Sequence, residues 1–409
     1  MGKEIYDVIV WGATGFTGKW VAKHFYDQYH ETPLRWAMAG RNIKKLKEVA
    51  SFIGDTTYEV PTILADSEDE ASLMNMVNQT KVVLSTVGPY AYYGSLLVKV
   101  CAETGTHYCD LTGEVPWMRR MISEHHDIAQ KSGARIVFSC GFDSIPSDIG
   151  VHFLQEQAKA AFNEPLIQVK FYMLAAKGGA SGGTIHSLLN VIEESKDSQE
   201  VADLLENPYA LNPNYLTFDG PDMQDQSKAR YESQIKKWTA PFIMGAINTR
   251  IVRRSNALLD FSYGKNFSYT ETQVTGAGIK GRLAAEVMAG GFKLLWLFAS
   301  KEVTLSLLKK YILPSQGKGP EVDPDNPGFY KILLIGQTAS GDQLSAIVRG
   351  DADPGYGSTS KMLSEAAICL AEYEEPLHVA GGCWTPASAM GATLLKRLRS
   401  NAGLSFDIK

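Results

Sequence analysis

Short apolar runs alternate with helical stretches along the first 140 residues, and this alternation limits the possible fold more than any other sequence feature. Six runs have the length and character of buried strands: residues 6–11, 34–39, 62–65, 82–87, 107–109 and 135–140. Between them, apolar residues recur at helical spacing, as in Val21, Phe25 and Tyr29. Strands that alternate with helices form parallel sheets through right-handed crossovers. We therefore expect an α/β domain, with a doubly wound parallel sheet of the Rossmann type, over residues 1–150.

The alternation stops after residue 150. Residues 167–175 and 267–275 have strand character, and residues 329–337 and 343–350 are typical of an antiparallel hairpin. Helices are expected over residues 185–194 and 359–371, and the proline- and glycine-rich residues 315–328 indicate an exposed loop. These patterns predict a second, α+β domain over residues 151–355 with a largely antiparallel sheet.

Charge and cysteine content narrow the classes of partner. The chain of 409 residues has 40 Lys and Arg against 45 Asp and Glu, a net charge of −5, so no basic excess favours a nucleic-acid partner. Its five cysteines include no C-x-x-C pair, which disfavours a metal site or a disulfide framework. The N-terminus runs directly into a strand without a signal peptide. We expect a cytoplasmic protein without a bound metal.

Three glycines lie between the first strand and the first helix. Gly12, Gly15 and Gly18 are spaced three residues apart. A dinucleotide loop needs glycine for its tight turn, for close approach of the pyrophosphate and for packing of the helix on the strand. The helix N-terminus then offers free N–H groups to the phosphates. We predict a dinucleotide site here, which also includes Thr14, Phe16 and Thr17.

The end of the second strand selects between NAD and NADP. An acidic residue there binds the ribose hydroxyl of NAD, whereas an arginine accommodates the phosphate of NADP. This chain has Arg41 and no neighbouring carboxylate, which favours NADP over NAD. Asp66, after the third strand, is either a contact of the adenine or an N-cap of the next helix.

The turn after the fourth strand is expected beside the nicotinamide ribose, because ligands of such sheets bind at the carboxyl ends of the strands. Its residues are Thr86, Val87, Gly88, Pro89 and Tyr90.

Several motifs together resemble the saccharopine dehydrogenase-like oxidoreductases, a family that includes the trans-acting enoyl reductases. They occupy residues 8–18, 39–41, 87–94, 110–114, 141–148 and 381–387, so the resemblance covers nearly the whole chain. It implies that the second domain is inserted into the first, which residues from about 356 to 409 complete. It does not imply a single activity. No tyrosine has a lysine four positions on, so the catalytic Tyr-x-x-x-Lys pair of many short-chain reductases is excluded.

Acid–base residues beside the cofactor are harder to assign. Asp110, Glu114, Asp143 and Asp148 follow the fifth and sixth strands, and burial of any one could raise its pKa enough to deliver a proton. The same residues suit turns and N-caps. From the whole chain, the catalytic candidates are Tyr90, Asp143 and His186.

Residues 283–299 are strongly apolar but contain Glu286 and Lys293, and they are too short to span a membrane. They predict one of two roles. The first is a helix in the core or at a dimer interface, and the second is a surface that meets acyl chains or a membrane interface.

Taken together, these features favour an NADP(H)-dependent oxidoreductase that transfers hydride to or from a lipid or other apolar acyl substrate, as a homodimer with possible peripheral attachment to lipid surfaces. Two alternatives remain open. One is a saccharopine-type amino-acid dehydrogenase, and the other is a non-catalytic, lipid-associated nucleotide-binding protein.

Overall fold

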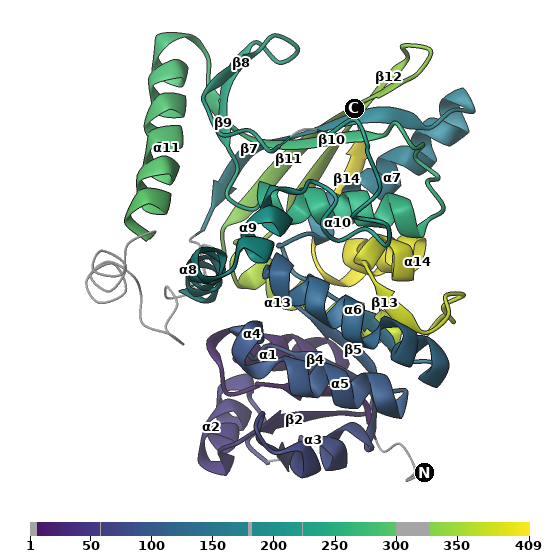
Figure 1. The fold of residues 1–409 in the computed structure, drawn as a ribbon. Coiled ribbons are helices and arrows are strands. Elements are labelled where there is room, and N and C mark those ends of the chain that lie inside the picture. The colour runs from purple at the N-terminus through teal and green to yellow at the C-terminus, as the bar shows by residue number, and fades with distance from the viewer. Residues whose placement is uncertain (1–5, 58, 179–181, 223, 300–326) are drawn as a thin grey trace. The chain divides into compact units, whose positions relative to one another are not determined.

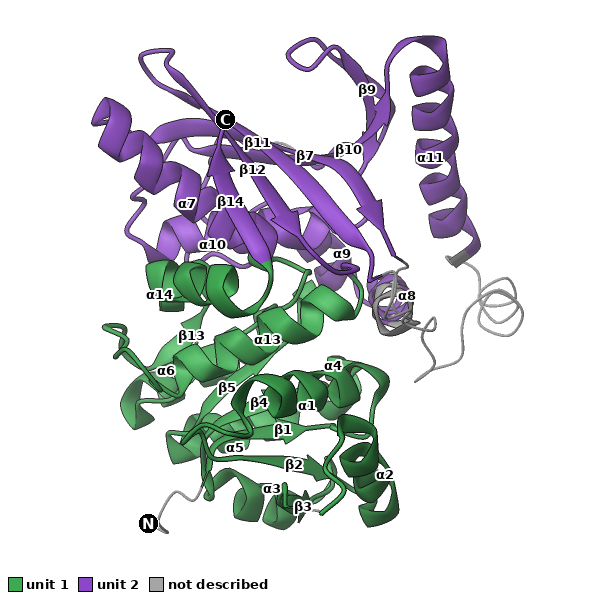
Figure 2. Cartoon of the chain, turned by 180° about the vertical axis from the view of Figure 1, so that it is seen from behind, with its two compact units in different colours: residues 1–145, 317–322, 355–403 green, residues 146–316, 323–354, 404–409 purple. Residues whose placement is uncertain are grey.

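The computed structural model describes residues 6–57, 59–178, 182–222, 224–299 and 327–409. The chain divides into two compact units, drawn in green and purple in Figure 2. The described part of unit 1 covers residues 6–145 and 355–403, and that of unit 2 covers residues 146–299, 327–354 and 404–409. The predicted loop at residues 315–328 lies almost entirely outside the described residues.

Unit 1 contains a parallel sheet of seven strands in the order β13-β6-β5-β4-β1-β2-β3 (Figure 1). The strands are β1 (Tyr6–Trp11), β2 (Trp36–Gly40), β3 (Thr62–Leu64), β4 (Thr80–Ser85), β5 (His107–Asp110), β6 (Arg135–Val137) and β13 (Gly382–Trp384). Residues of β1, β2 and β4 are almost wholly buried, as expected for a sheet covered on both faces. This confirms the predicted α/β class.

Two layers of helices cover this sheet. In one layer α1 (Phe16–Tyr29) lies between α2 (Ile43–Ile53) and α13 (Gly357–Leu370). In the other, α5 (Ser95–Thr104) lies between α3 (Glu70–Val77) and α6 (Val115–Ser132). The short helix α4 (Tyr90–Tyr93) precedes α5, and α14 (Pro386–Asn401) contacts α13.

The C-terminal part of the chain thus returns to unit 1. Helix α13 packs on β4 and β5, and a buried cluster joins it to α1: the Glu365 carboxylate accepts hydrogen bonds from the Tyr29 hydroxyl (2.7 Å) and from Arg397 Nε (2.9 Å). Thr385 caps α14 with its side chain. The seventh strand, β13, was not predicted, because the sequence pattern there indicates only a turn.

Unit 2 contains a mixed sheet in the order β14-β12-β11-β7-β10-β9-β8. Its strands are β7 (Leu166–Lys177), β8 (Arg230–Glu232), β9 (Lys237–Pro241), β10 (Ser268–Gly276), β11 (Phe329–Thr338), β12 (Gln343–Gly350) and β14 (Leu404–Ile408). Only β7 and β10 pair in parallel, so the sheet is largely antiparallel, as predicted. Strand β14 pairs with β12, which places residues 404–409 in unit 2 and not in unit 1.

The helices of unit 2 are α7 (Ile145–Phe162), which leads in from unit 1, α8 (Gly182–Asp197), α9 (Gln199–Glu206), α10 (Gly245–Leu258) and α11 (Gly278–Ala299). Helix α10 is buried along most of its length although it carries three arginines. Among the described residues, no helix combines the length and the hydrophobicity needed to cross a membrane.

Candidate functional site

The glycine loop between β1 and α1 has the close contacts that its spacing predicts. Gly12 has φ +86°, and a Cβ atom there would lie 2.6 Å from Val87 Cγ2 and 2.7 Å from Thr86 Oγ1. A Cβ atom at Gly18 would lie 2.1 Å from the carbonyl oxygen of Gly12. Neither position tolerates a side chain, so the glycines let α1 approach the turn closely.

The N-terminus of α1 suits an anion. Its N-cap residue is Gly15, no described side chain caps the helix, and its first turn contains no acidic residue. Gly15 is exposed, and the first turn of a helix offers backbone N–H groups to phosphate oxygens. The open cradle and the positive end of the helix fit a dinucleotide pyrophosphate.

Two side chains of this region have contacts that the sequence did not indicate. The ring of Phe16 meets the ring of Tyr356 edge-on, with 4.3 Å between centroids, so the Phe16 side chain anchors the loop to the segment before α13. The Lys19 ammonium lies 4.6 Å from the centroid of the Phe16 ring. A positive charge therefore lies close to the loop. Tyr356 is remote in sequence, and only the folded chain brings it here.

Arg41 follows the last residue of β2 and is exposed. The next residue, Asn42, caps α2 by accepting hydrogen bonds from the backbone N–H groups of Lys44 (3.0 Å) and Lys45 (3.1 Å). Arg41 thus stands where an acidic residue would stand in an NAD-binding protein, and exposed Lys44 and Lys45 follow at the start of α2. Asp66 accepts a hydrogen bond from the Glu68 N–H (3.1 Å), a local turn contact of one carboxylate oxygen.

The turn after β4 is joined to the glycine loop. The Thr86 N–H donates to the Trp11 carbonyl (2.9 Å), and the Thr86 hydroxyl lies 3.1 Å from the Gly12 carbonyl oxygen. Gly88 is exposed and is followed by a cis peptide bond to Pro89. The structure therefore brings this predicted turn and the glycine loop together at the carboxyl ends of β1 and β4.

The side chain of Tyr90 lies inside the protein. Only 3% of it is exposed, and its hydroxyl donates to the Ser85 carbonyl (3.1 Å) and accepts from the Leu111 N–H (3.4 Å). Burial raises the pKa of Tyr90 well above its ordinary value. These contacts give Tyr90 a part in holding the turn and do not favour it as a proton donor.

Two buried carboxylates support the same strand ends. The Glu114 carboxylate accepts hydrogen bonds from the N–H groups of Tyr90 and Ala91, both at 2.9 Å, and so caps α4. Asp110 joins β5 to the segment after β6, because its Oδ1 accepts from the Thr112 N–H (3.1 Å) and the Ser139 N–H (3.0 Å). Burial raises the pKa of Asp110 to about 7. Both carboxylates therefore have structural partners.

Asp143 differs from Asp110 and Glu114 in its exposure and in the segment that carries it. It lies in the segment between β6 and α7 and is half-buried, and burial raises its pKa to about 7. The segment is held by α13, since the Phe142 N–H donates to the Thr359 hydroxyl (3.0 Å). Ser144, the next residue, has φ +139°, which few residues other than glycine adopt. This geometry keeps a carboxyl group of near-neutral pKa close to the end of β6.

The remaining candidates belong to unit 2. The Asp148 carboxylate is buried and accepts a hydrogen bond from the Ser255 hydroxyl (2.5 Å), which ties α7 to α10. His186 belongs to α8, but its side chain lies outside the described residues.

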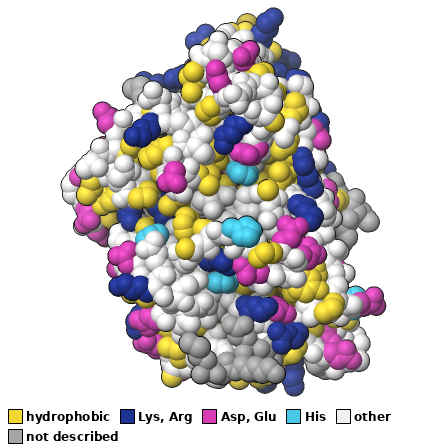
Figure 3. All heavy atoms as spheres, turned by 90° about the vertical axis from the view of Figure 1, so that its right-hand side faces the viewer, with side chains coloured by type: hydrophobic (Ala, Val, Ile, Leu, Met, Phe, Trp, Pro, Cys, Tyr) yellow, Lys and Arg dark blue, Asp and Glu magenta, His cyan; other side chains and the backbone are white. Residues whose placement is uncertain are grey.

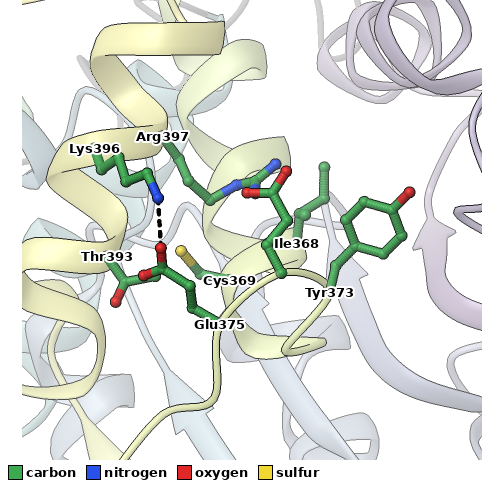
Figure 4. A pocket seen from close by; sticks show the side chains of 8 residues that line it. Ile368, Cys369, Tyr373, Glu375, Thr393, Lys396 and Arg397 are labelled. Atoms are coloured by element: carbon green, nitrogen blue, oxygen red, sulfur yellow. Dashed lines mark hydrogen bonds and ion pairs between the residues drawn. The ribbon is translucent and has the colours of Figure 1, made fainter.

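A hollow of unit 1 lies elsewhere, between the C-terminal part of α13 and α14 (Figure 4). An ion pair between Lys396 and Glu375 lies at its side, and its lining includes Tyr373 and Arg397. None of its lining residues belongs to the glycine loop or to the turn after β4. It therefore does not extend the dinucleotide site.

Comparisons with known proteins agree with this geometry. Residues 8–137 match the saccharopine dehydrogenase NADP binding domain. A candidate trans-acting enoyl reductase of Mycobacterium tuberculosis is 37% identical over 409 residues, which cover 98% of this chain and 97% of that protein. The trans-acting enoyl reductase of Mycobacterium ulcerans is 35% identical, with 96% and 95% covered.

Among solved structures, the apo saccharopine dehydrogenase (L-Glu forming) of Saccharomyces cerevisiae superposes with a TM-score of 0.57 over 99% of both chains, at 12% identity. That likeness shows a shared fold. The matched domain confirms NADP as the cofactor. The chain belongs to the saccharopine dehydrogenase-like family of NADP-dependent oxidoreductases, together with the trans-acting enoyl reductases.

Proposed function

We propose that this protein reduces the carbon–carbon double bond of an α,β-unsaturated acyl substrate, a lipid or another apolar acyl compound, with NADPH. The observation that carries the proposal is the cradle at Gly12 and Gly18, beside an uncapped helix N-terminus, in a chain similar along nearly its whole length to named enoyl reductases. In this proposal the N–H groups of the first turn of α1 hold the pyrophosphate. Arg41 binds the ribose phosphate, and the turn 86–89 lies against the nicotinamide ribose.

Asp143 is the proton donor in this proposal. When bound, NADPH supplies the hydride, which adds to the carbon atom β to the carbonyl group. The carboxyl group of Asp143 gives its proton to the α carbon, so the double bond becomes a single bond and the carboxylate is left ionised. A pKa of about 7 keeps a useful fraction of this acid protonated near neutral pH.

The saccharopine-type alternative needs basic side chains that bind a dicarboxylic amino acid, and the buried arginines of α10 already have partners. Arg250 Nη1 binds Asp225 (2.9 Å), and Arg253 Nε binds Asp222 (2.5 Å). Arg254 Nη1 donates to the carbonyl oxygen of Leu211. These arginines bind Leu205, Leu211, Asp222 and Asp225 of the same unit, so they are not free to bind a dicarboxylic amino acid, which supports the acyl substrate.

The test is NADPH oxidation by the purified protein with enoyl thioesters of increasing chain length, compared with NADP⁺ reduction by saccharopine. We expect activity with the enoyl thioesters, with a rate that falls as pH rises through about 7, because Asp143 then loses its proton. Asp143→Asn should lower kcat by about 10²- to 10⁴-fold, the usual contribution of a general acid, and leave NADPH binding unchanged.

A matched control is Asp127→Asn, which changes an exposed carboxylate of the same unit and should keep full activity. NADPH binding without turnover of any enoyl thioester would instead support the non-catalytic alternative. Turnover that is unaffected by Asp143→Asn would remove Asp143 from the mechanism.

A further inference from the structure

Helix α11 has two apolar faces, and one of them packs on the described strands of unit 2. The inner face consists of small residues spaced four apart, Gly281, Ala285 and Ala289, which are buried where the helix packs on β9 and β10. Figure 1 shows α11 at the edge of unit 2, alongside β8 and β9. This packing excludes the predicted core position for the helix as a whole.

The outer face carries large apolar side chains. It consists of residues with exposures of 52% to 86%: Ile279, Leu283, Val287, Leu294 and Leu297. At 3.6 residues per turn these positions fall within an arc of about 80°, opposite the buried glycine and alanines. Trp296, also half-exposed, lies outside this arc. This apolar stripe, which has Gly290 in place of a large side chain between Val287 and Leu294, is typical of a surface that meets another molecule.

The charge around this stripe is positive. Helix α11 carries Lys280, Arg282 and Lys293 against Glu286 alone, in a chain with a net charge of −5. On the face of the molecule shown in Figure 3, by contrast, acidic and basic side chains are interspersed.

This charge discriminates between the possible occupants of the stripe. A second copy of α11 would bring like charge against Lys280 and Lys293. An anionic lipid surface would bring opposite charge to the basic residues and acyl chains to the apolar stripe.

We infer that the outer face of α11 docks on an anionic lipid bilayer, with the helix axis in the plane of the membrane interface. The apolar stripe enters the region of the acyl chains, and the basic side chains remain among the headgroups. This attachment uses no residue of the dinucleotide site. It goes beyond the proposed reduction and stands or fails independently of it.

The experiment is flotation of the full-length protein with vesicles of phosphatidylcholine alone or mixed with phosphatidylglycerol. We expect binding to the mixed vesicles that weakens at high salt, because screening reduces the attraction of exposed charges. The double substitution Leu283→Ser and Leu294→Ser should reduce the bound fraction by about tenfold or more, since each leucine contributes through burial of its apolar area. Both side chains are exposed, so the fold should persist, and unchanged NADPH binding would verify this.

The matched control is Leu216→Ser, which removes a leucine of unit 2 outside α11 that is more exposed (80%) than Leu283 or Leu294, and it should leave flotation unchanged. Light scattering after size-exclusion chromatography identifies the rival occupant. A dimer that the double substitution converts to a monomer, without vesicle binding, would overturn the inference in favour of a second copy. A monomer that floats with neither vesicle would also overturn it.

Discussion

Substitution of Asp110 by asparagine tests the electrostatics of the strand ends that form the site. Asp110 Oδ1 accepts hydrogen bonds from the N–H groups of Thr112 and Ser139, and Oδ2 lies 2.9 Å from the Tyr108 hydroxyl. An asparagine keeps an oxygen for the two N–H groups, and its amide nitrogen can donate to the hydroxyl instead. We therefore expect Asp110→Asn to fold, with a changed dependence of stability on pH.

The size of the expected change in stability follows from the pKa of Asp110. Burial raises the pKa of Asp110 from 3.8 to about 7, so the folded state binds this proton more tightly than the unfolded state does. The stability that protonation contributes is fully present below pH 3.8 and is lost as pH rises through about 7. One pH unit corresponds to about 1.4 kcal/mol, which sets an upper limit of about 4 kcal/mol on the loss.

The assay is the midpoint of thermal unfolding of the wild type and of Asp110→Asn across this pH range. The amide does not titrate, so the wild type should lose stability relative to the variant as pH rises from about 4 to about 7. Titratable groups that both proteins share contribute equally to the two midpoints, so their contributions cancel in the difference between the wild type and the variant. A difference that stays constant with pH would refute the reasoning, since Asp110 would then have the same pKa in the folded and unfolded states.

Three further substitutions test the cofactor site. Arg41→Ala should lower the affinity for NADPH by about 5- to 15-fold and leave the affinity for NADH nearly unchanged, because a charge-assisted contact at an exposed position is partly screened. Fluorescence titration measures both affinities, with Lys47→Ala as the control. Equal losses of affinity for the two dinucleotides would contradict the assignment of Arg41 to the ribose phosphate. Gly18→Ala should abolish binding of both dinucleotides or the fold itself, since its Cβ would lie 2.1 Å from the Gly12 carbonyl oxygen. Glu114→Gln should lower affinity for both dinucleotides several-fold, because one N–H group of α4 loses its acceptor; an unchanged affinity in titration would show that the turn does not depend on this cap.

The sequence predicted the strands β1 to β6 because each is a local apolar run bounded by turns, and the glycine loop because its backbone geometry depends on residue type alone. Strands β13 and β14 were not predicted, because each forms by pairing with a strand that is remote in the sequence. Gly382–Trp384 has only three residues and becomes a strand by pairing with β6, which lies far away in sequence. Strand β14 likewise depends on β12, and this pairing puts residues 404–409, which were predicted to complete the first domain, in unit 2.

The candidate site was likewise predictable only in the features that local residue type determines. Residue type and spacing identified the glycine loop whose close contacts the structure shows, because glycine is required at Gly12 and Gly18 for steric reasons. They did not show that the hydroxyl of Tyr90 turns inward to Ser85, or that Thr359 holds the segment of Asp143, since both depend on contacts between distant parts of the chain. The predicted homodimer and the role of His186 stay predictions.

The four carboxylates after the fifth and sixth strands were equivalent in the sequence, and their hydrogen-bond partners separate them. Asp110 and Glu114 accept from backbone N–H groups, and Asp148 accepts from the Ser255 hydroxyl. A carboxylate with such donors is fixed in place and is costly to move, which suits support of a loop. Asp143 is half-buried and owes its raised pKa to burial alone. A group in that condition can release its proton without breaking the structure around it. For this reason we propose Asp143 as the proton donor and expect Asp110 and Glu114 to support the strand ends of the candidate site.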